Sequence, residues 1–215
     1  MTADEKTAEP SPATTTRRRL VVGVSGASGV QYGVRALQLL RQMDIETHLV
    51  VTKPAAMTLG YETDLTVADL RALADHSYNL MDVGAAISSG SFQTMGMLIA
   101  PCSVRTMSEI ATGVTSSLLT RAADVVLKER RRLVLMVRET PLHLGHLRSM
   151  TALTEMGAII APPLPAFYAK PATVDDIITQ SAARALDLFG LGAPGTKRWK
   201  EGDAVSQAPD TAYDE

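Results

Sequence analysis

The chain has 215 residues, of which 46% are hydrophobic and 20% charged, so it has enough apolar side chains for a core and is neither a disordered nor a fibrous protein. Its 21 basic and 23 acidic side chains give a formal net charge of −2, which argues against binding to nucleic acid or to an anionic membrane. One cysteine excludes an internal disulfide and a multi-thiolate metal site, and no apolar run reaches the roughly 20 residues of a membrane span. We therefore expect a cytoplasmic globular protein.

The two ends of the chain differ in composition from its middle. Residues 1–16 consist mainly of threonine, alanine, proline and charged side chains without apolar periodicity, and residues 201–215 are again mostly polar. We predict a disordered N-terminal tail over residues 1–16, one domain over residues 17–200 and a loose C-terminal tail over residues 201–215.

Between these tails, short apolar runs alternate with segments of helical periodicity. We predict strands at Leu20–Val24, Glu46–Val51, Met97–Ala100, Leu133–Val137 and Ala158–Ala161. We predict helices at Val30–Gln42, Ser103–Ile110, Thr115–Arg131, His143–Met156 and Val174–Phe189. Nearly continuous apolar strands that alternate with helices are typical of a parallel sheet covered on both faces. The sequence therefore predicts a single α/β domain with three layers.

Ligands of such sheets bind beyond the carboxyl ends of the strands, so the loops that follow the strands are the candidate sites. The first of these loops, Gly23–Gly29, consists of small residues that let the backbone approach a ligand, and the next helix offers N–H groups to an anion. Its spacing is not that of a dinucleotide fingerprint, a triphosphate loop or a nucleophile elbow. Two interpretations stay open: a tight turn without a ligand, and a site for a mononucleotide phosphate or a flavin.

Polar residues also follow the next three predicted strands. Thr52–Pro54 places a hydroxyl and a cation after the second strand, and Pro101–Thr106 places hydroxyls and an arginine after the third. Arg138 and Glu139 follow the fourth strand, where a surface ion pair is the simplest interpretation of the two residues alone. Four polar loops at one edge of a sheet together favour a binding site.

Two further segments carry side chains whose role the pattern leaves open. Arg121, Asp124 and Lys128 share one face of a predicted helix, and such a face is more often solvated and paired with itself than functional. Ser88–Phe92 is rich in hydroxyl groups and is either an ordinary loop or a cover over a ligand.

The histidines and the cysteine are weaker candidates. His143 and His146 have no third ligand at a metal-binding spacing, so we predict no metal there. Cys102 follows an apolar strand without a partner base, so we interpret it as a small residue at a strand end and not as a nucleophile.

These motifs, in this order, resemble those of the UbiX-type flavin prenyltransferases. The resemblance runs from about Arg19 to Trp199 through GVSGASGVQYG, ISSGSF, APCSVRT, TRAADVVLKERRRLVL, VRETPL and PAFY, and then Arg184. It implies a flavodoxin-like or Rossmann-like α/β sandwich in a large homo-oligomer, a dodecamer in this family. It also implies a reaction that joins the dimethylallyl group of dimethylallyl phosphate to reduced FMN and that requires no metal. The product implied is the prenylated FMN that UbiD-type decarboxylases use.

The same resemblance implies roles for individual residues. The residues that match FMN-binding positions are Gly26, Ala27, Ser28, Thr52, Ser103, Val104, Arg105, Thr106 and Arg138. Those that match catalytic positions are Ser28, Lys128 and Glu139. Those that match the surroundings of the prenyl phosphate are Ser91, Arg121, Lys128, Tyr168, Arg184 and Trp199. The chemistry agrees, because expelling a phosphate requires cations and removing a ring proton requires a base, either Glu139 or the departing phosphate.

The sequence departs from the family pattern at two places. Gln93 stands where close relatives often have arginine, which puts a phosphate role at that position in doubt, and the segment His143–Met150 differs from the commoner form.

Two alternative functions use the same features. A flavin-dependent cysteine decarboxylase would carry a histidine in the first helix and a Pro-Ala-Ser-Ala-Asn-Thr stretch, where this chain has VQYG and PCSVRT. A non-catalytic FMN-binding subunit of a decarboxylase would not need Lys128, Glu139, Tyr168 and Arg184.

Overall fold

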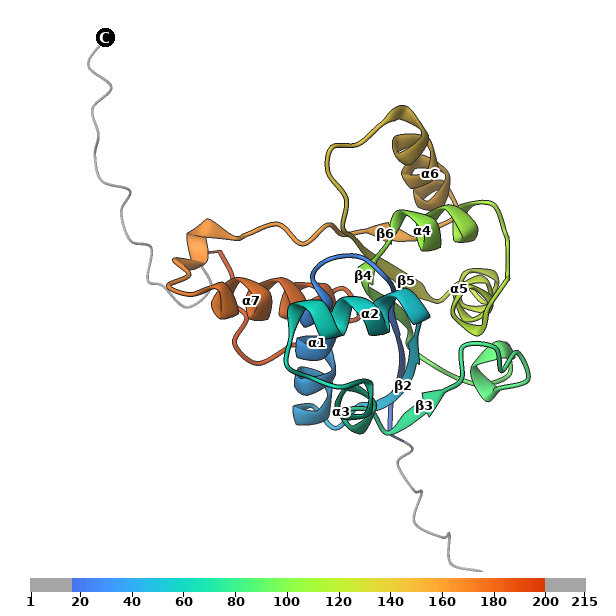
Figure 1. The fold of residues 1–215 in the computed structure, drawn as a ribbon, viewed down its shortest axis with the longest axis horizontal. Helices are drawn as coiled ribbons and strands as arrows, with labels where there is room; N and C mark the ends of the chain where they lie inside the picture. Colours follow the sequence, from blue (N-terminus) through green and yellow to red (C-terminus); the bar gives the residue numbers. More distant parts are fainter. Residues whose placement is uncertain (1–16, 200–215) are drawn as a thin grey trace, which may run out of the picture.

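The structure, a computed structural model, describes residues 17–199. Its centre is one parallel sheet of six strands in the order β3-β2-β1-β4-β5-β6 (Figure 1). The strands are β1 Arg19–Val24, β2 Glu46–Val51, β3 His76–Tyr78, β4 Gly96–Cys102, β5 Arg132–Val137 and β6 Ile159–Ile160. The chain winds outward in both directions from β1 and β4, so the topological switch point lies between these two strands.

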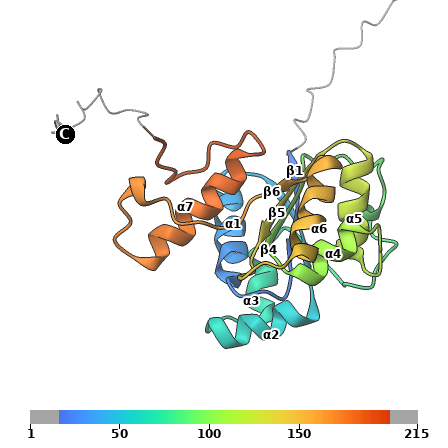
Figure 2. The same cartoon turned by 90° about the horizontal axis from the view of Figure 1, so that it is seen from above.

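Helices cover both faces of the sheet. They are α1 Val30–Gln42, α2 Lys53–Glu62, α3 Val67–Ala72, α4 Val104–Ala111, α5 Leu118–Lys128, α6 Leu144–Glu155 and α7 Val174–Asp187, with short 3-10 turns at Ala86–Ser88 and Phe167–Ala169. Figure 2 shows α1 and α7 on one face and α4, α5 and α6 on the other. No helix over residues 17–199 is long and apolar enough to cross a membrane.

The core consists of two apolar layers, one on each side of the sheet. Along β4, Leu98 and Ala100 pack into the layer under α1 and α7, whereas Met97 and Ile99 pack into the layer under α4 and α5. This alternation follows from the two-residue period of a strand, and every residue of β4 is buried. A strand buried on both faces explains why its sequence is continuously apolar.

The predicted fold class is confirmed, and each of the five predicted strands and five predicted helices has a counterpart in the structure. The predicted helix Thr115–Arg131 is shorter in the structure, because Ser117 caps α5 through the Thr120 N–H. Sequence reasoning missed α2, α3 and β3. The Thr52–Pro54 stretch that we interpreted as a loop is the start of α2, since Thr52 caps the helix and proline is favoured in a first turn. The predicted tails, 1–16 and 201–215, lie outside the described residues.

Candidate functional site

A cavity of about 560 Å³ lies at the carboxyl ends of β1, β2 and β4, beside the topological switch point. This is the size of a small-molecule site. Its lining comes from the loops that follow β1, β2, β3 and β4, from α4 and from the start of α5: Gly26, Thr52, Lys53, Pro54, Leu80, Met81, Ser103, Val104, Arg105, Thr106, Glu109, Ser116, Ser117, Leu119 and Thr120. Six of the nine residues that match FMN-binding positions are in this set: Gly26, Thr52, Ser103, Val104, Arg105 and Thr106.

Ser25 holds two walls of the cavity together. It is 1% exposed, and its hydroxyl donates to the Pro101 carbonyl at 3.0 Å and accepts the Ser103 N–H at 2.8 Å. The loop after β1 is thereby fixed to the loop after β4. Sequence reasoning did not assign a role to Ser25, because its partners are distant in the chain.

The loop after β1 also packs tightly against the first turn of α2. A Cβ atom at Gly26 would overlap the ring of Pro54, so this position requires glycine. Ala27 and Ser28 belong to the same loop, and the Ala27 N–H donates to the Ser25 carbonyl at 2.9 Å.

The N-termini of α2 and α4 both border the cavity. Thr52 caps α2 by accepting the Ala55 N–H at 3.2 Å, and Ser103 caps α4 by accepting the Thr106 N–H at 3.3 Å. Free N–H groups and the positive ends of two helix dipoles therefore lie near the cavity, an arrangement that favours an anion.

The N-terminus of α1 differs from our expectation. The Glu62 carboxylate accepts the Gly29 N–H at 2.8 Å and the Val30 N–H at 3.2 Å. These two donors are satisfied by the protein itself, so the prediction that they are free for a ligand is wrong for this structure. Sequence reasoning missed Glu62, which reaches α1 from the last turn of α2.

Apolar and charged groups form the rest of the wall. Leu80, Met81 and Leu119 present apolar surface, which suits a flat ring system. Glu109 lies on the same wall and is held by Arg105 at 3.0 Å and by the Ser116 hydroxyl at 3.1 Å.

Arg138 and Glu139 follow β5 at the same edge of the sheet. The Arg138 N–H donates to the Cys102 carbonyl at 3.0 Å, which places Arg138 next to the strand end that carries Ser103. Both side chains are exposed. Burial raises the pKa of the Tyr32 phenol on α1, and the nearby Arg138 charge partly opposes that rise. Tyr32 therefore also lies near this edge.

Lys128 and Ser91 lie at the opposite, amino edge of the sheet. Helix α5 runs antiparallel to the strands, so its first turn borders the cavity and its last residue, Lys128, is far from it. Lys128 Nζ donates to Glu129 at 2.6 Å. Arg131 donates to the carbonyls of Gly90 at 2.6 Å and Phe92 at 2.7 Å, which fixes the loop that carries Ser91. Within a single chain, Lys128 and Glu139 therefore lie at opposite edges of the sheet.

Arg121 lies on α5 between these two edges. It forms an ion pair with Asp124 at 2.7 Å, in agreement with the self-paired interpretation of this helix face.

Tyr168, Arg184 and Trp199 lie together beside α7. They line a cavity of about 310 Å³ with Asp187, Thr196, Lys197 and Arg198. The Tyr168 and Trp199 rings meet edge to face, with centroids 5.7 Å apart. Tyr168 and Arg184 also line a neighbouring cavity of about 280 Å³ with apolar walls. We call this region the arm pocket, because the segment between β6 and α7 extends away from the sheet (Figure 1).

The cysteine and the histidine pair occupy structural positions. Cys102 is fully buried, and burial raises the pKa of its thiol to about 12, so it is not a nucleophile at neutral pH. His143 caps α6 through the Gly145 N–H at 3.0 Å, and its ring stacks on His146 with centroids 3.6 Å apart.

Comparisons with known proteins place these observations in a family. The family model described as Flavoprotein matches residues 8–186. Two curated flavin prenyltransferases named UbiX are similar over most of the chain. The Neisseria meningitidis protein is 57% identical over 183 residues, covering 85% of this chain and 97% of its own length. The Escherichia coli K12 protein is 59% identical over 178 residues, covering 82% and 94%.

Solved structures show the same similarity. AnUbiX (PadA1), crystallised with FMN and dimethylallyl pyrophosphate, superposes with a TM-score of 0.85 at 48% identity, covering 87% of this chain and all of that one. A dodecameric FMN-dependent UbiX-like decarboxylase from E. coli O157:H7 superposes with a TM-score of 0.83 at 51% identity, covering 85% and 100%. The cysteine decarboxylase TvaF shares 19% identity at a TM-score of 0.57, which is a likeness of fold alone.

Proposed function

The chain belongs to the UbiX family of flavin prenyltransferases, and on that premise we propose which of its residues carry each part of the reaction. The protein is a flavin prenyltransferase that binds FMN. It joins a dimethylallyl group to reduced FMN, and we propose dimethylallyl phosphate as the donor. The observation that carries the residue assignment is the cavity at the switch point, which combines apolar walls with two helix N-termini.

We propose that this cavity holds FMN. The apolar side chains Leu80, Met81 and Leu119 suit the flat ring system, and the N-termini of α2 and α4 suit the phosphate. Gly26 supports this assignment, since its backbone borders the cavity and admits no side chain. When bound, reduced FMN supplies the nucleophilic ring atoms that accept the prenyl group.

The cationic residues hold the leaving phosphate in this proposal. Cleaving an allylic carbon–oxygen bond leaves negative charge on the phosphate, and charge-assisted hydrogen bonds stabilise that charge. Lys128, Arg121, Arg138 and Arg184 supply the donors, while Ser91, Tyr168 and Trp199 border the phosphate or the prenyl chain.

Glu139 is our candidate for the base. The second bond to the flavin forms with loss of a ring proton, and Glu139 offers an exposed carboxylate at the same edge of the sheet as the cavity to accept it. The departing phosphate is the competing acceptor. We assign Ser28, in the loop after β1, to polarising the flavin or relaying a proton.

Because one chain keeps these groups apart, we propose that neighbouring copies complete the site. A strand as long as β1, which has six residues, spans about 17 Å. Lys128 and Glu139 lie at opposite ends of such strands. The arm, by which we mean the segment from the end of β6 to the first residue of α7, leaves large apolar side chains uncovered in a single chain, since Leu164 is 74%, Phe167 76% and Val174 72% exposed. Apolar surface of this kind is typical of a protein interface. A homododecamer in which the arm packs on other copies accounts for both observations.

We also propose the setting of the reaction. The prenylated FMN serves a UbiD-type decarboxylase, the reaction itself needs no metal, and the protein works in the cytoplasm.

One assay tests the proposed reaction. Purified protein is mixed with FMN, a reductant and dimethylallyl phosphate without oxygen, and the flavin mass is measured. We expect the mass to increase by one five-carbon prenyl unit. An unchanged mass, from protein shown to bind FMN, would contradict the proposal, and decarboxylation of a cysteinyl peptide would favour the cysteine decarboxylase instead.

A further inference from the structure

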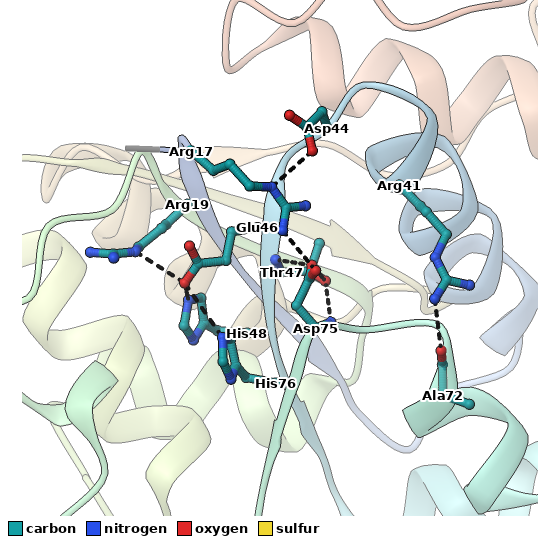
Figure 3. Close-up of polar contacts among 10 residues, drawn as sticks. All are labelled: Arg17, Arg19, Arg41, Asp44, Glu46, Thr47, His48, Ala72, Asp75 and His76. Atoms are coloured by element: carbon teal, nitrogen blue, oxygen red, sulfur yellow. Dashed lines mark hydrogen bonds and ion pairs between the residues drawn. The ribbon is translucent and has the colours of Figure 1, made fainter. Parts of the chain in front are cut away.

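Glu46, His48 and His76 converge at the amino ends of β2 and β3, on the edge of the sheet opposite the cavity (Figure 3). Glu46 and His48 are two residues apart on β2, so they point to the same face. His76 lies on β3 directly opposite His48 in the parallel register. The fold therefore sets one carboxylate and two imidazoles side by side.

The distances from Glu46 to the two histidines are close to those of a metal site. Glu46 Oε1 lies 3.1 Å from His48 Nε2 and 3.5 Å from His76 Nε2, and all three ligand atoms are within 4.8 Å of one another. Zinc bonds of about 2.0–2.2 Å in a tetrahedral arrangement place neighbouring ligand atoms about 3.3–3.6 Å apart. Small side-chain rotations therefore bring the three atoms to the separations that a metal requires.

The surroundings orient the ligands. His48 is 2% exposed, its Nδ1 lies 2.8 Å from the Tyr78 hydroxyl, and its ring meets Phe92 edge to face at 5.0 Å. A partner on the second ring nitrogen is the arrangement that holds the ring of a metal-binding histidine in place, and the Tyr78 hydroxyl can either donate to Nδ1 or accept from it. His76 is 53% exposed, so the site is open to solvent on that side for entry and for a fourth ligand.

Arg19 contacts the cluster, and its positive charge influences which metal ions the cluster favours. Arg19 Nε donates to Glu46 Oε1 at 3.1 Å, and its guanidinium lies over the Phe92 ring at 4.8 Å. Arg19 offsets the Glu46 charge, so a hard cation that depends on carboxylate charge gains little here. Imidazole ligands instead favour borderline transition metals such as Zn²⁺.

We propose that Glu46, His48 and His76 bind one divalent transition metal ion of the Zn²⁺ type, which joins β2 to the short edge strand β3. Binding moves the ring hydrogen of His48 from Nε2, where it donates to Glu46, to Nδ1, which then donates to the Tyr78 oxygen. The site lies away from the cavity and takes no part in prenyl transfer. Its effect is to stabilise the folded chain, since an ion bound only by the native state adds to the free energy of unfolding.

Calorimetric titration of the untagged protein with Zn²⁺ tests this site, because a histidine tag would itself bind the ion. We expect saturable binding of one ion per chain in wild type. His76→Gln and Glu46→Gln should each weaken binding by about tenfold or more. The matched control is His143→Gln/His146→Gln, which removes the other histidine pair of the chain and should bind as wild type. Unchanged affinity in His76→Gln, or lost affinity in the control, would overturn the proposal.

Thermal unfolding gives a second readout that does not depend on activity. Zn²⁺ should raise the Tm of wild type and of the histidine-pair control, and should raise the Tm of His76→Gln by much less. His76 is half exposed, so this variant should fold, and circular dichroism without metal checks that it does. An equal rise in Tm for all three proteins, or no rise in wild type at saturating Zn²⁺, would mean that this cluster does not bind the ion.

Discussion

The Ser25 hydroxyl accepts the Ser103 N–H at 2.8 Å and donates to the Pro101 carbonyl at 3.0 Å, joining the loops that follow β1 and β4. These loops form opposite sides of the topological switch point. The hydroxyl therefore holds the loop after β1 at a fixed distance from the loop after β4. The proposed FMN cavity depends on that separation.

Ser25→Ala should destabilise the protein and weaken FMN binding. Removing the hydroxyl takes the acceptor from the part-buried Ser103 N–H and one of two donors from the Pro101 carbonyl, which keeps the Ser25 N–H at 3.2 Å, at a cost of about 1–3 kcal/mol. Urea unfolding measures the stability, and quenching of flavin fluorescence measures the affinity. Ser116→Ala is the control for stability, because that exposed hydroxyl donates to the side chain of Glu109 and its loss should change stability by less than about 0.5 kcal/mol. Equal losses of stability in the two variants would contradict the bridging role.

Gly26→Ala should weaken FMN binding by roughly tenfold or more, because the added methyl group overlaps Pro54 and displaces the loop that borders the cavity. Gly60→Ala provides the contrast on the same helix as Pro54. A Cβ at Gly60 meets nothing within 4 Å, so this change should leave affinity intact and stabilise α2 by about 0.5–1 kcal/mol. FMN affinity of Gly26→Ala equal to that of wild type would place the flavin elsewhere.

The loops around the cavity were predictable because each carries its own local signal. The small residues before α1 and the capping Ser103 can be identified within a few positions of the sequence. Ser25 and Glu62 act through partners far along the chain, and no local pattern indicates such a pairing. The strand β3 was missed for a different reason, because its three residues include an exposed His76 and form no apolar run.

The Glu46-His48 spacing contained a signal that sequence reasoning did not use. A carboxylate and an imidazole two residues apart on a strand share a face, but the third group, His76, is assigned to them only by the register of β2 and β3. The separation of Lys128 from Glu139 likewise became visible only once the direction of α5 was known.

Glu139→Gln should slow flavin prenylation far more than it weakens FMN binding, because it removes a base and keeps the shape of the side chain. Single-turnover formation of prenylated FMN, followed beside an FMN titration, separates the two effects. Equal losses of turnover and FMN affinity in Glu139→Gln would indicate a structural role.

Arg184→Ala should instead raise the concentration of dimethylallyl phosphate that is required for half-maximal turnover.

Mixing two inactive variants should restore activity if neighbouring copies share a site. Lys128→Ala and Glu139→Gln each disable every site in a pure oligomer. A mixed oligomer contains some sites in which both residues are intact, because the two positions then come from different copies. The mixture is unfolded and refolded together, and its prenylation rate is compared with that of the variants refolded separately. Activity no higher than the sum of the two would show that each chain builds its own site.

Cys102 should make the protein less stable at alkaline pH. Burial raises the pKa of this thiol to about 12 in the folded chain, whereas an unfolded cysteine has a pKa of about 8.5. Above pH 9 the unfolded chain therefore binds fewer protons than the folded chain, and the free energy of unfolding falls by up to about 1.4 kcal/mol per pH unit. Cys102→Ala removes this contribution, so the stability of wild type should fall more steeply than that of the variant between about pH 9 and 10.5. Urea unfolding across this range gives the two slopes, and parallel slopes would show that the thiol ionises in the folded protein.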